Sequence, residues 1–239
     1  MRYLVLSDLH ANWEALRAVL AAARGCYDQV LCCGDLAGYG PDPNPVIEWV
    51  RASTASVIRG NHDRACAGME DMEWFNPVAR AANLWTTAHL SPGNLAYLRD
   101  LPCGPLAVGD FQIAHGSPSD ENEYLMSVAD AAVALSKLET NLAFFGHTHV
   151  QCAFLWMHGR FGAMAGPRLR LEADAAWLIN PGAVGQPRDG DPRAAYALYD
   201  TELNEVMQCR VSYDYETTAR KIIAAGLPDV LAARLALGR

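Results

Sequence analysis

The stretch Arg2–His10, RYLVLSDLH, begins with an apolar run and ends with a carboxylate and an imidazole. The apolar run predicts a buried β-strand, because a strand that is covered on both faces is hydrophobic along its length. Residues 12–24 have apolar side chains at helical spacing, and a second apolar run follows at 29–33. This order of strand, helix and strand predicts a βαβ unit with parallel strands.

The alternation continues as far as residue 59, and the remainder of the chain departs from it. A helix is predicted at 44–52 and a short strand at 56–59, whereas residues 65–100 show helical patterns only. Beyond this segment, short apolar runs separated by turn signals favour antiparallel strands. The predicted strands there are 104–108, 111–115, 142–145, 151–157, 160–164, 176–179, 195–199 and 205–211, and the predicted helices are 128–138 and two within 215–237. We therefore expect an α/β (α+β) fold with two sheets and outer helices in a single domain, 1–239.

The composition limits the classes of function. The chain has 239 residues, of which 51% are hydrophobic and 19% are charged, as in a globular protein with a sizeable core. Its net charge of -8 argues against an extended nucleic acid as partner, and it has neither a long apolar stretch nor a signal-peptide start. The seven cysteines show no metal-site spacing, so we expect reduced, mostly buried thiols and a cytoplasmic location.

Potential metal ligands follow the predicted strands. Five of the seven histidines lie at or just beyond strand ends, together with two aspartates and an asparagine. Because ligand sites of α/β sheets gather at the carboxyl ends of strands, these side chains are expected to converge in one crevice. The set consists of Asp8, His10, Asp35, Asn61, His62, His115, His147 and His149.

The spacing within the set predicts shared ions. Residues two apart in an extended segment point the same way, so Asp8 and His10 could hold one ion together, and so could His147 and His149. Neighbouring glycines are expected to allow sharp backbone turns, namely Gly34, Gly60, Gly116 and Gly146.

The chemistry of the ligands indicates the kind of metal. Carboxylates, imidazoles and an amide without thiolate favour Mn, Fe, Zn, Ni or Co. Two acids, one amide and four imidazoles exceed what one ion takes, so two ions about 3.5–4 Å apart, joined by a carboxylate and water, are the simplest arrangement. Such pairs suit displacement at phosphorus.

Five short motifs in this order carry a family resemblance. They are DLH (8–10), GDLAGYG (34–40), GNHD (60–63), HG (115–116) and GHTH (146–149), followed by NPGAVGQPRDGDPRAAYALYD (180–200). The series resembles the calcineurin-like metallophosphoesterase superfamily, and in particular a compact prokaryotic branch of phosphodiesterases and diadenosine-tetraphosphatase relatives. The resemblance implies a four-layer αββα sandwich of two mixed β-sheets with helices on the outer faces.

The resemblance also implies a role for each ligand. Asp8, His10 and His149 would hold the first ion, and Asp35 would bridge to the second. The second ion would be held by Asn61, His115 and His147. A hydroxide between the two divalent ions would attack phosphorus, with Mn favoured for activity.

Three residues of the GNHD motif receive catalytic roles from the resemblance. His62 would act as general acid or charge stabiliser near the leaving group, and Asp63 would orient His62 from behind. Asn61 would contact both metal and phosphate. The neighbouring segment 65–100, with Trp74, Phe75 and Trp85, is expected to form a lid or an interface.

Several activities remain open. The favoured function is a phosphodiesterase acting on a small phosphate ester, and the first alternative is a nucleotide pyrophosphohydrolase of the diadenosine-tetraphosphate type. A protein serine/threonine phosphatase is disfavoured, because Gly38-Tyr39-Gly40 stands where that branch has an acid, an arginine and a glycine. A catalytically inert metal-binding scaffold is the alternative from a different class. The assembly could be homo-oligomeric, and no membrane partner is expected.

Four arginines lie near the motif loops in the sequence, and one or more of them could bind a substrate phosphate. They are Arg59, Arg64, Arg188 and Arg193.

Overall fold

The RYLVL run forms the central strand of the first of two six-stranded sheets in the computed structural model, which describes residues 1–239. The first sheet has the order β3 (Ser56–Val57), β2 (Gln29–Cys32), β1 (Arg2–Leu6), β11 (Ala194–Asp200), β12 (Glu205–Val211) and β9 (Arg168–Arg170). The second has the order β4 (Leu106–Val108), β5 (Phe111–Ile113), β6 (Leu142–Phe144), β10 (Ala176–Asn180), β7 (Cys152–Met157) and β8 (Arg160–Met164).

Both sheets mix parallel and antiparallel pairs. Strand β1 pairs with β2 and β2 with β3 in parallel, while β11, β12 and β9 join in antiparallel order. In the second sheet β5, β6 and β10 are parallel, and β4, β7 and β8 pair antiparallel. The expected antiparallel pairing of the later strands is confirmed for β4, β7, β8, β11 and β12, but it is wrong for β6, which pairs in parallel with both β5 and β10.

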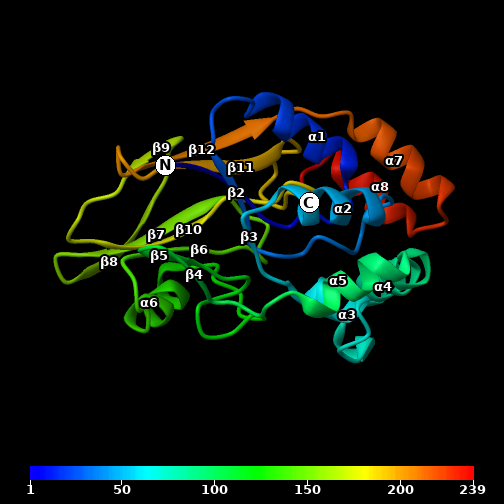
Figure 1. Ribbon diagram of the computed structural model, residues 1–239, viewed down its shortest axis with the longest axis horizontal. Helices are drawn as coiled ribbons and strands as arrows, with labels where there is room; N and C mark the ends of the chain where they lie inside the picture. The colour runs from blue at the N-terminus through cyan, green and yellow to red at the C-terminus, as the bar shows by residue number, and fades with distance from the viewer.

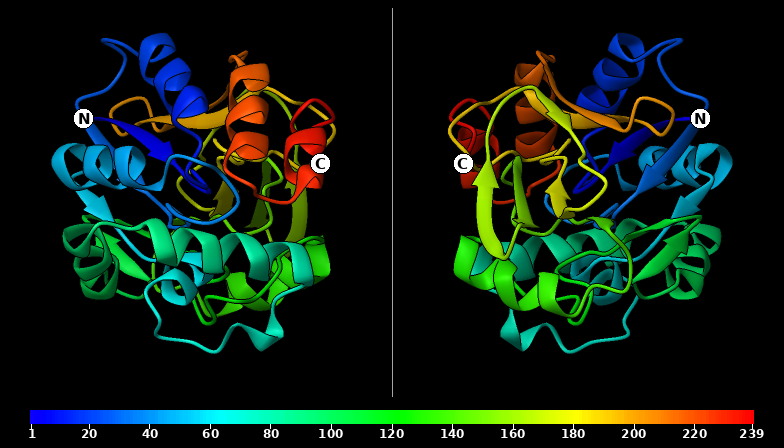
Figure 2. Two further views of the ribbon diagram at one scale, coloured as in Figure 1. Left: turned by 90° about the vertical axis from the view of Figure 1, so that its right-hand side faces the viewer. Right: turned by 90° about the vertical axis from the view of Figure 1, so that its left-hand side faces the viewer.

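Eight α-helices surround the sheets. They are α1 (Trp13–Ala22), α2 (Pro43–Ser53), α3 (Asn61–Cys66), α4 (Pro77–His89), α5 (Pro92–Asp100), α6 (Val128–Ser136), α7 (Tyr215–Ala224) and α8 (Asp229–Leu235), with a 3₁₀ turn at Met72–Trp74. Helices α3 to α5 and α7 to α8 lie together at one end of the sandwich (Figure 1). In Figure 2 the chain between α3 and α4 protrudes below the helices α3 to α5. No helix has the length and apolarity needed to cross a membrane.

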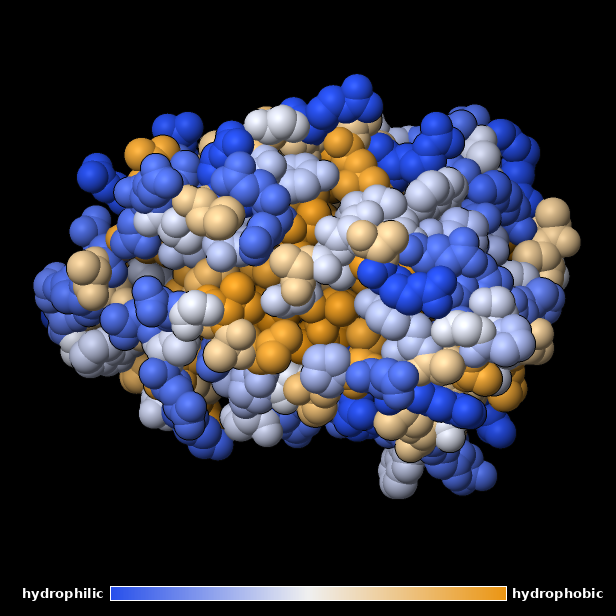
Figure 3. All heavy atoms as spheres, viewed as in Figure 1, coloured by the Kyte–Doolittle hydropathy of each residue, from blue (hydrophilic) through white to orange (hydrophobic).

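Apolar residues form the contact between the sheets and the contacts with the helices. Val5 and Leu31 of the first sheet pack against Phe144 and Trp177 of the second. Leu16 of α1 and the apolar face of α2 cover the outer side of the first sheet, and α6 covers the second. The four-layer αββα sandwich is thus confirmed. Hydrophobic side chains also appear in Figure 3 over the middle of one face, where the edge strands β3 and β4 lie.

Two elements differ from the sequence prediction. The GNHD motif was expected in a loop beyond a strand, but it begins helix α3, whose N-cap is Gly60. Strand β9 was not predicted, because its three residues alternate arginine and leucine at an exposed sheet edge.

All seven cysteines are free, yet only Cys32, Cys33 and Cys66 are buried, so the expectation of mostly buried thiols is wrong.

Candidate metal centre

The motif loops follow the carboxyl ends of parallel strands and fold back sharply. Residues Asp8 and His10 after β1 and Asp35 after β2 have positive φ, as do His147 and His149 after β6. The prediction that these motifs are extended is therefore wrong. Hydrogen bonds between loops hold them instead, for example from Asp8 N to Gly34 O at 3.0 Å and from His10 N to Asp35 O at 3.0 Å.

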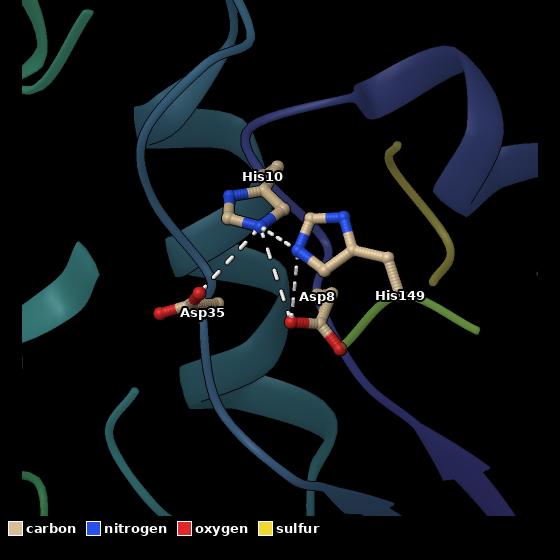
Figure 4. Close-up of side chains that lie close together, drawn as sticks. All are labelled: Asp8, His10, Asp35 and His149. Atoms are coloured by element: carbon tan, nitrogen blue, oxygen red, sulfur yellow. Dashed lines mark hydrogen bonds and ion pairs between the residues drawn. The ribbon is translucent and has the colours of Figure 1, made fainter. Parts of the chain in front are cut away.

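Four buried side chains form the first group of potential ligands. Asp8, His10, Asp35 and His149 each offer a ligand atom, and these atoms lie within 4.8 Å of one another. Figure 4 shows the two imidazoles and two carboxylates pointing toward a common centre. The closest pair is Nε2 of His10 and Nε2 of His149, 3.0 Å apart.

A second group shares Asp35 with the first. It consists of Asp35, His115 and His147, all buried. Asn61 adjoins it, because its Oδ1 lies 3.1 Å from Nε2 of His115. His147 and His149 thus fall into different groups, and the expectation that they hold one ion together is wrong.

The Asp35 carboxylate lies between the two groups. Its Oδ2 is 3.5 Å from Nε2 of His10 and 3.4 Å from Nε2 of His115. Its Oδ1 accepts a hydrogen bond of 2.9 Å from the backbone N–H of His62, in the first turn of α3. One carboxylate oxygen therefore faces ligands of both groups while the other is held by the helix.

The hydrogen bonds of the imidazoles fit a cation between them. Nδ1 of His10 donates to Ala37 O at 2.9 Å, and Nδ1 of His149 donates to Gln186 O at 2.6 Å. These bonds leave both Nε2 atoms as lone-pair donors that face each other, an arrangement that a metal ion would stabilise. His115 Nδ1 likewise bonds to Cys33 O, and buried Nε2 of His147 has no partner.

The pKa values of the histidines also fit a site for cations. Burial lowers the pKa of His10 and of His149, which keeps both imidazoles neutral and able to ligate. Burial opposes protonation of His115 as well, but Asp35 and Asp8 outweigh it and raise its pKa to about 9. The two carboxylates thus create a field that attracts positive charge at the second group.

Glycines near the centre mainly allow neighbouring side chains to pack close against the backbone. Of the four singled out in the sequence, only Gly34 has positive φ, at 95°. A Cβ on Gly60 would overlap Oδ1 of Asp35, and one on Gly146 would overlap Oγ of Ser7. The prediction of sharp turns fits Gly34 only. Gly60 and Gly146 are needed instead because a side chain there would overlap its neighbours.

His62 lies at the edge of the centre, but Asp63 does not orient it. Nδ1 of His62 bonds to Oδ1 of Asn83 on α4 at 2.8 Å. Asp63 instead accepts from Gly60 N at 3.0 Å and from Ala37 N at 2.9 Å, and so ties the GNHD and GDLAGYG loops together. The expected contact between Asp63 and the His62 ring is wrong. Asn83 was missed because it is 21 residues from His62 and lies in no recognised motif.

The NPG segment at 180–182 supports the GHTH loop. Asn180 Nδ2 donates to Gly146 O at 2.8 Å and to Thr148 Oγ1 at 3.0 Å.

The two histidines outside the motifs lie away from the centre: His89 bonds to Trp85 O, and His158 is in a surface turn.

Comparison with known proteins agrees with this geometry. The family model of the calcineurin-like phosphoesterase superfamily domain matches residues 1–204. An uncharacterized protein of Methanocaldococcus jannaschii is 34% identical over 249 residues, which cover 98% of this chain and 97% of the relative.

Two solved structures extend the comparison to the fold. A metallophosphoesterase from Sphaerobacter thermophilus is 41% identical with a TM-score of 0.88, and the match covers 100% of this chain and 99% of that one. A hypothetical protein from Pyrococcus horikoshii, 21% identical with a TM-score of 0.81, shares the fold over 100% of this chain and 98% of its own. The chain belongs to the calcineurin-like phosphoesterase superfamily and is a hydrolase of phosphoric ester bonds.

Proposed function

We propose that the chain hydrolyses small phosphate diesters at a pair of divalent cations, with residues 1–239 acting as one unit. The position of Asp35 between two groups of ligands carries this proposal, because a single carboxylate facing both groups is what a bridging ligand requires. Two cations held there would supply Lewis acidity and an activated water for attack on phosphorus.

The side chains divide into two ligand sets in the proposal. Asp8, His10 and His149 hold one cation, His115, His147 and Asn61 hold the other, and Asp35 serves both. Asn61 lies at the start of α3, so its amide can contact a phosphoryl oxygen as well as a cation. Nitrogen and oxygen ligands without thiolate suit Mn, Fe, Zn, Ni or Co, and among these we propose manganese for activity, as the family resemblance implies.

His62 is the proposed general acid. Its Nδ1 is occupied by Asn83, and its ring packs against Tyr39 and Phe75, with centroids 4.4 Å and 5.0 Å away. These contacts fix the ring and leave Nε2 to meet the leaving oxygen or a phosphoryl oxygen of the substrate. Because Nδ1 donates to Asn83, Nε2 holds a transferable proton only in the imidazolium form; burial lowers the pKa of His62, and the charge of Asp35 opposes this. Phe75 belongs to segment 65–100, which supports our proposal that this segment covers part of the site.

The whole chain contributes to the proposed unit. Leu231 and Leu235 of α8, beyond the matched family region, pack in one apolar cluster with Tyr39. The free cysteines fit a reducing compartment, and we place the protein in the cytoplasm.

The direct test is hydrolysis of bis-p-nitrophenyl phosphate with Mn²⁺, before and after treatment with a chelator. We expect turnover that chelation abolishes and Mn²⁺ restores. Asp35→Asn should lose metal from both positions and abolish turnover, because its carboxylate serves both ligand sets. Exposed Asp110→Asn provides the matched control and should behave as the wild type.

Metal content by atomic absorption separates the outcomes. About two ions per chain are expected in the wild type, in line with a dinuclear site. If Asp35→Asn keeps full metal content and rate, the bridging assignment is wrong. If the wild type binds metal but hydrolyses neither this diester nor p-nitrophenyl phosphate with Mn²⁺, Ni²⁺, Co²⁺ or Mg²⁺, the inert scaffold is the better description.

A further inference from the structure

The four arginines near the motif loops differ in their partners. Arg59 pairs with Glu121 at 3.3 Å, Arg64 with Glu70 at 2.7 Å, and Arg193 with Asp191 at 2.6 Å. Arg188 forms no ion pair with a carboxylate of the chain, although it lies in the loop that supports His149. It is therefore the arginine of the four whose charge remains available to a ligand.

Neutral groups hold Arg188 beside the metal centre. Its backbone N–H donates to His149 O at 3.1 Å, and its Nη2 donates to Oε1 of buried Gln186 at 3.1 Å. Its guanidinium carbon lies over the Tyr39 ring, 5.5 Å from the centroid. That ring in turn lies 4.7 Å from the His10 ring, so the guanidinium stands at the rim of the first ligand group.

A second arginine approaches the same place from the C-terminal helix. Arg234 lies on α8 between Leu231 and Leu235, which belong to the apolar cluster around Tyr39. Its Nε is buried and has no hydrogen-bond partner, and its guanidinium forms no ion pair with a carboxylate. Burial lowers the pKa of Arg234, and the positive charge of Arg188 lowers it further while Tyr39 acts in the opposite direction.

Two partly buried guanidinium groups near one another, without a carboxylate partner, form an arrangement that an anion stabilises. The buried Nε of Arg234 has no hydrogen-bond acceptor, and the charge of Arg188, whose Nη2 donates to neutral Gln186, has no carboxylate partner. The arrangement is notable in a chain of net charge -8, where acids are available elsewhere as partners. Its place next to Tyr39 and His10 makes a substrate group the natural anion.

We propose that Arg188 and Arg234 form a second phosphate subsite, which binds a phosphoryl group of the substrate other than the one attacked. The proposal rests on the proposed function of the metal centre and narrows its substrate class. A compound with linked phosphoryl groups, such as a nucleoside polyphosphate or a dinucleoside polyphosphate, can occupy both places at once. A diester with a single phosphorus can occupy only the metal centre.

The subsite also accounts for the sequence of the GDLAGYG loop. Tyr39 stands where the protein-phosphatase branch has an arginine, and the guanidinium of Arg188 lies over this tyrosine ring. The positive charge is thus supplied from the loop after β10 and from α8. Tyr39 supports Arg188 as an aromatic platform, and its ring packs in one apolar cluster with Leu231 and Leu235, the residues that flank Arg234 on α8.

The test uses the full chain and two substrates, diadenosine tetraphosphate and bis-p-nitrophenyl phosphate, with Mn²⁺. Arg188→Gln and Arg234→Gln should each lower kcat/KM for diadenosine tetraphosphate at least about tenfold more than for the diester, the loss expected for a charged hydrogen bond. Arg193→Gln, which loses an arginine already paired with Asp191, should match the wild type on both substrates. Thermal denaturation checks that the variants are folded.

Calorimetric titration with inorganic tripolyphosphate, with and without Mn²⁺, provides a readout that does not depend on turnover. Both variants should bind tripolyphosphate at least about tenfold more weakly than the wild type, whereas Arg193→Gln should not. Equal losses on the two substrates, or unchanged tripolyphosphate binding in either variant, would overturn the subsite. If the wild type hydrolyses neither substrate, the proposed function is wrong. The titration with tripolyphosphate would still decide whether the subsite exists.

Discussion

At the residue scale, the candidate ligands are unusual in their backbone as well as in their side chains. Asp8, His10, Asp35, His147 and His149 have φ between 44° and 65°. Residues other than glycine adopt this region at a cost of about 1–3 kcal/mol each, and such residues cluster at functional sites. Here the cost is offset by hydrogen bonds between the motif loops, so the ligands are positioned by the fold itself.

The support of His62 by Asn83 gives a prediction at this scale. Asn83→Ala removes the acceptor that fixes the His62 ring, and kcat should fall about 10–100-fold with metal content unchanged. His62→Ala should lower turnover by about 10²–10⁴-fold, as expected for loss of a general acid, and should also retain metal. Steady-state kinetics and atomic absorption measure both effects.

Thr86→Val is the matched control for Asn83→Ala. Thr86 is buried on the same helix and its hydroxyl has no partner, so the isosteric change should leave kcat near the wild-type value. A wild-type kcat in Asn83→Ala would show that the ring is fixed by Tyr39 and Phe75 alone. Loss of metal in His62→Ala would make His62 a ligand.

At the element scale, helix α3 shows how the short GNHD motif contributes to the centre through both its backbone and its side chains. Its first turn presents the His62 N–H to Asp35, while Asp63 in the same turn bonds back to Gly60 N. A helix start has free N–H groups that suit a carboxylate. The GNHD motif therefore binds the bridging carboxylate through its backbone in addition to offering Asn61 and His62.

The hairpin between β7 and β8 gives a prediction about stability. His158 and Gly159 both have positive φ, 51° and 75°, as in a two-residue type I′ turn. Asn tolerates this region better than His, so His158→Asn should raise the free energy of unfolding by about 0.5 kcal/mol. The exposed pair of His158 with Asp174 at 3.6 Å contributes little that would be lost.

Thermal denaturation measures this change as an increase in Tm of about 1–2 °C. His158→Val serves as the opposite control, because a β-branched residue is strained at positive φ and should lower Tm. A higher Tm in the valine variant would contradict the assigned turn.

At the scale of the whole molecule, the centre joins parts of the chain that are far apart. Ligands follow β1 and β2 of one sheet and β5 and β6 of the other, so a bound cation links both layers of the sandwich. The unfolded chain cannot assemble these ligands. Metal binding should therefore stabilise the folded state.

Chelation tests this coupling. Adding Mn²⁺ to chelator-treated protein at about 1,000 times its dissociation constant should add about 4 kcal/mol to the free energy of unfolding. For a chain of this size that corresponds to an increase in Tm of about 8–16 °C, at about 2–4 °C per kcal/mol. Asp35→Asn should show a much smaller increase, and exposed Asp71→Asn the full one. An unchanged Tm in the wild type would show that the ligands do not bind Mn²⁺.

The sequence by itself determined the family, the convergence of the ligands and the order of strands and helices except for β9 and α3, because each depends on local patterns. Apolar runs give buried strands, and strand ends in such sheets share one edge. Even the exchange of one phosphatase-like arginine for Tyr39 was visible in a single motif.

Only the tertiary structure decided which groups meet across long sequence separations. His62 bonds to Asn83 and not to the predicted Asp63. Of the four arginines near the motif loops, only Arg188 has no carboxylate partner. The backbone of the ligand loops also turned out left-handed instead of extended. Contacts of this kind depend on how the layers pack, and packing is a property of the whole chain that no local pattern of residues contains.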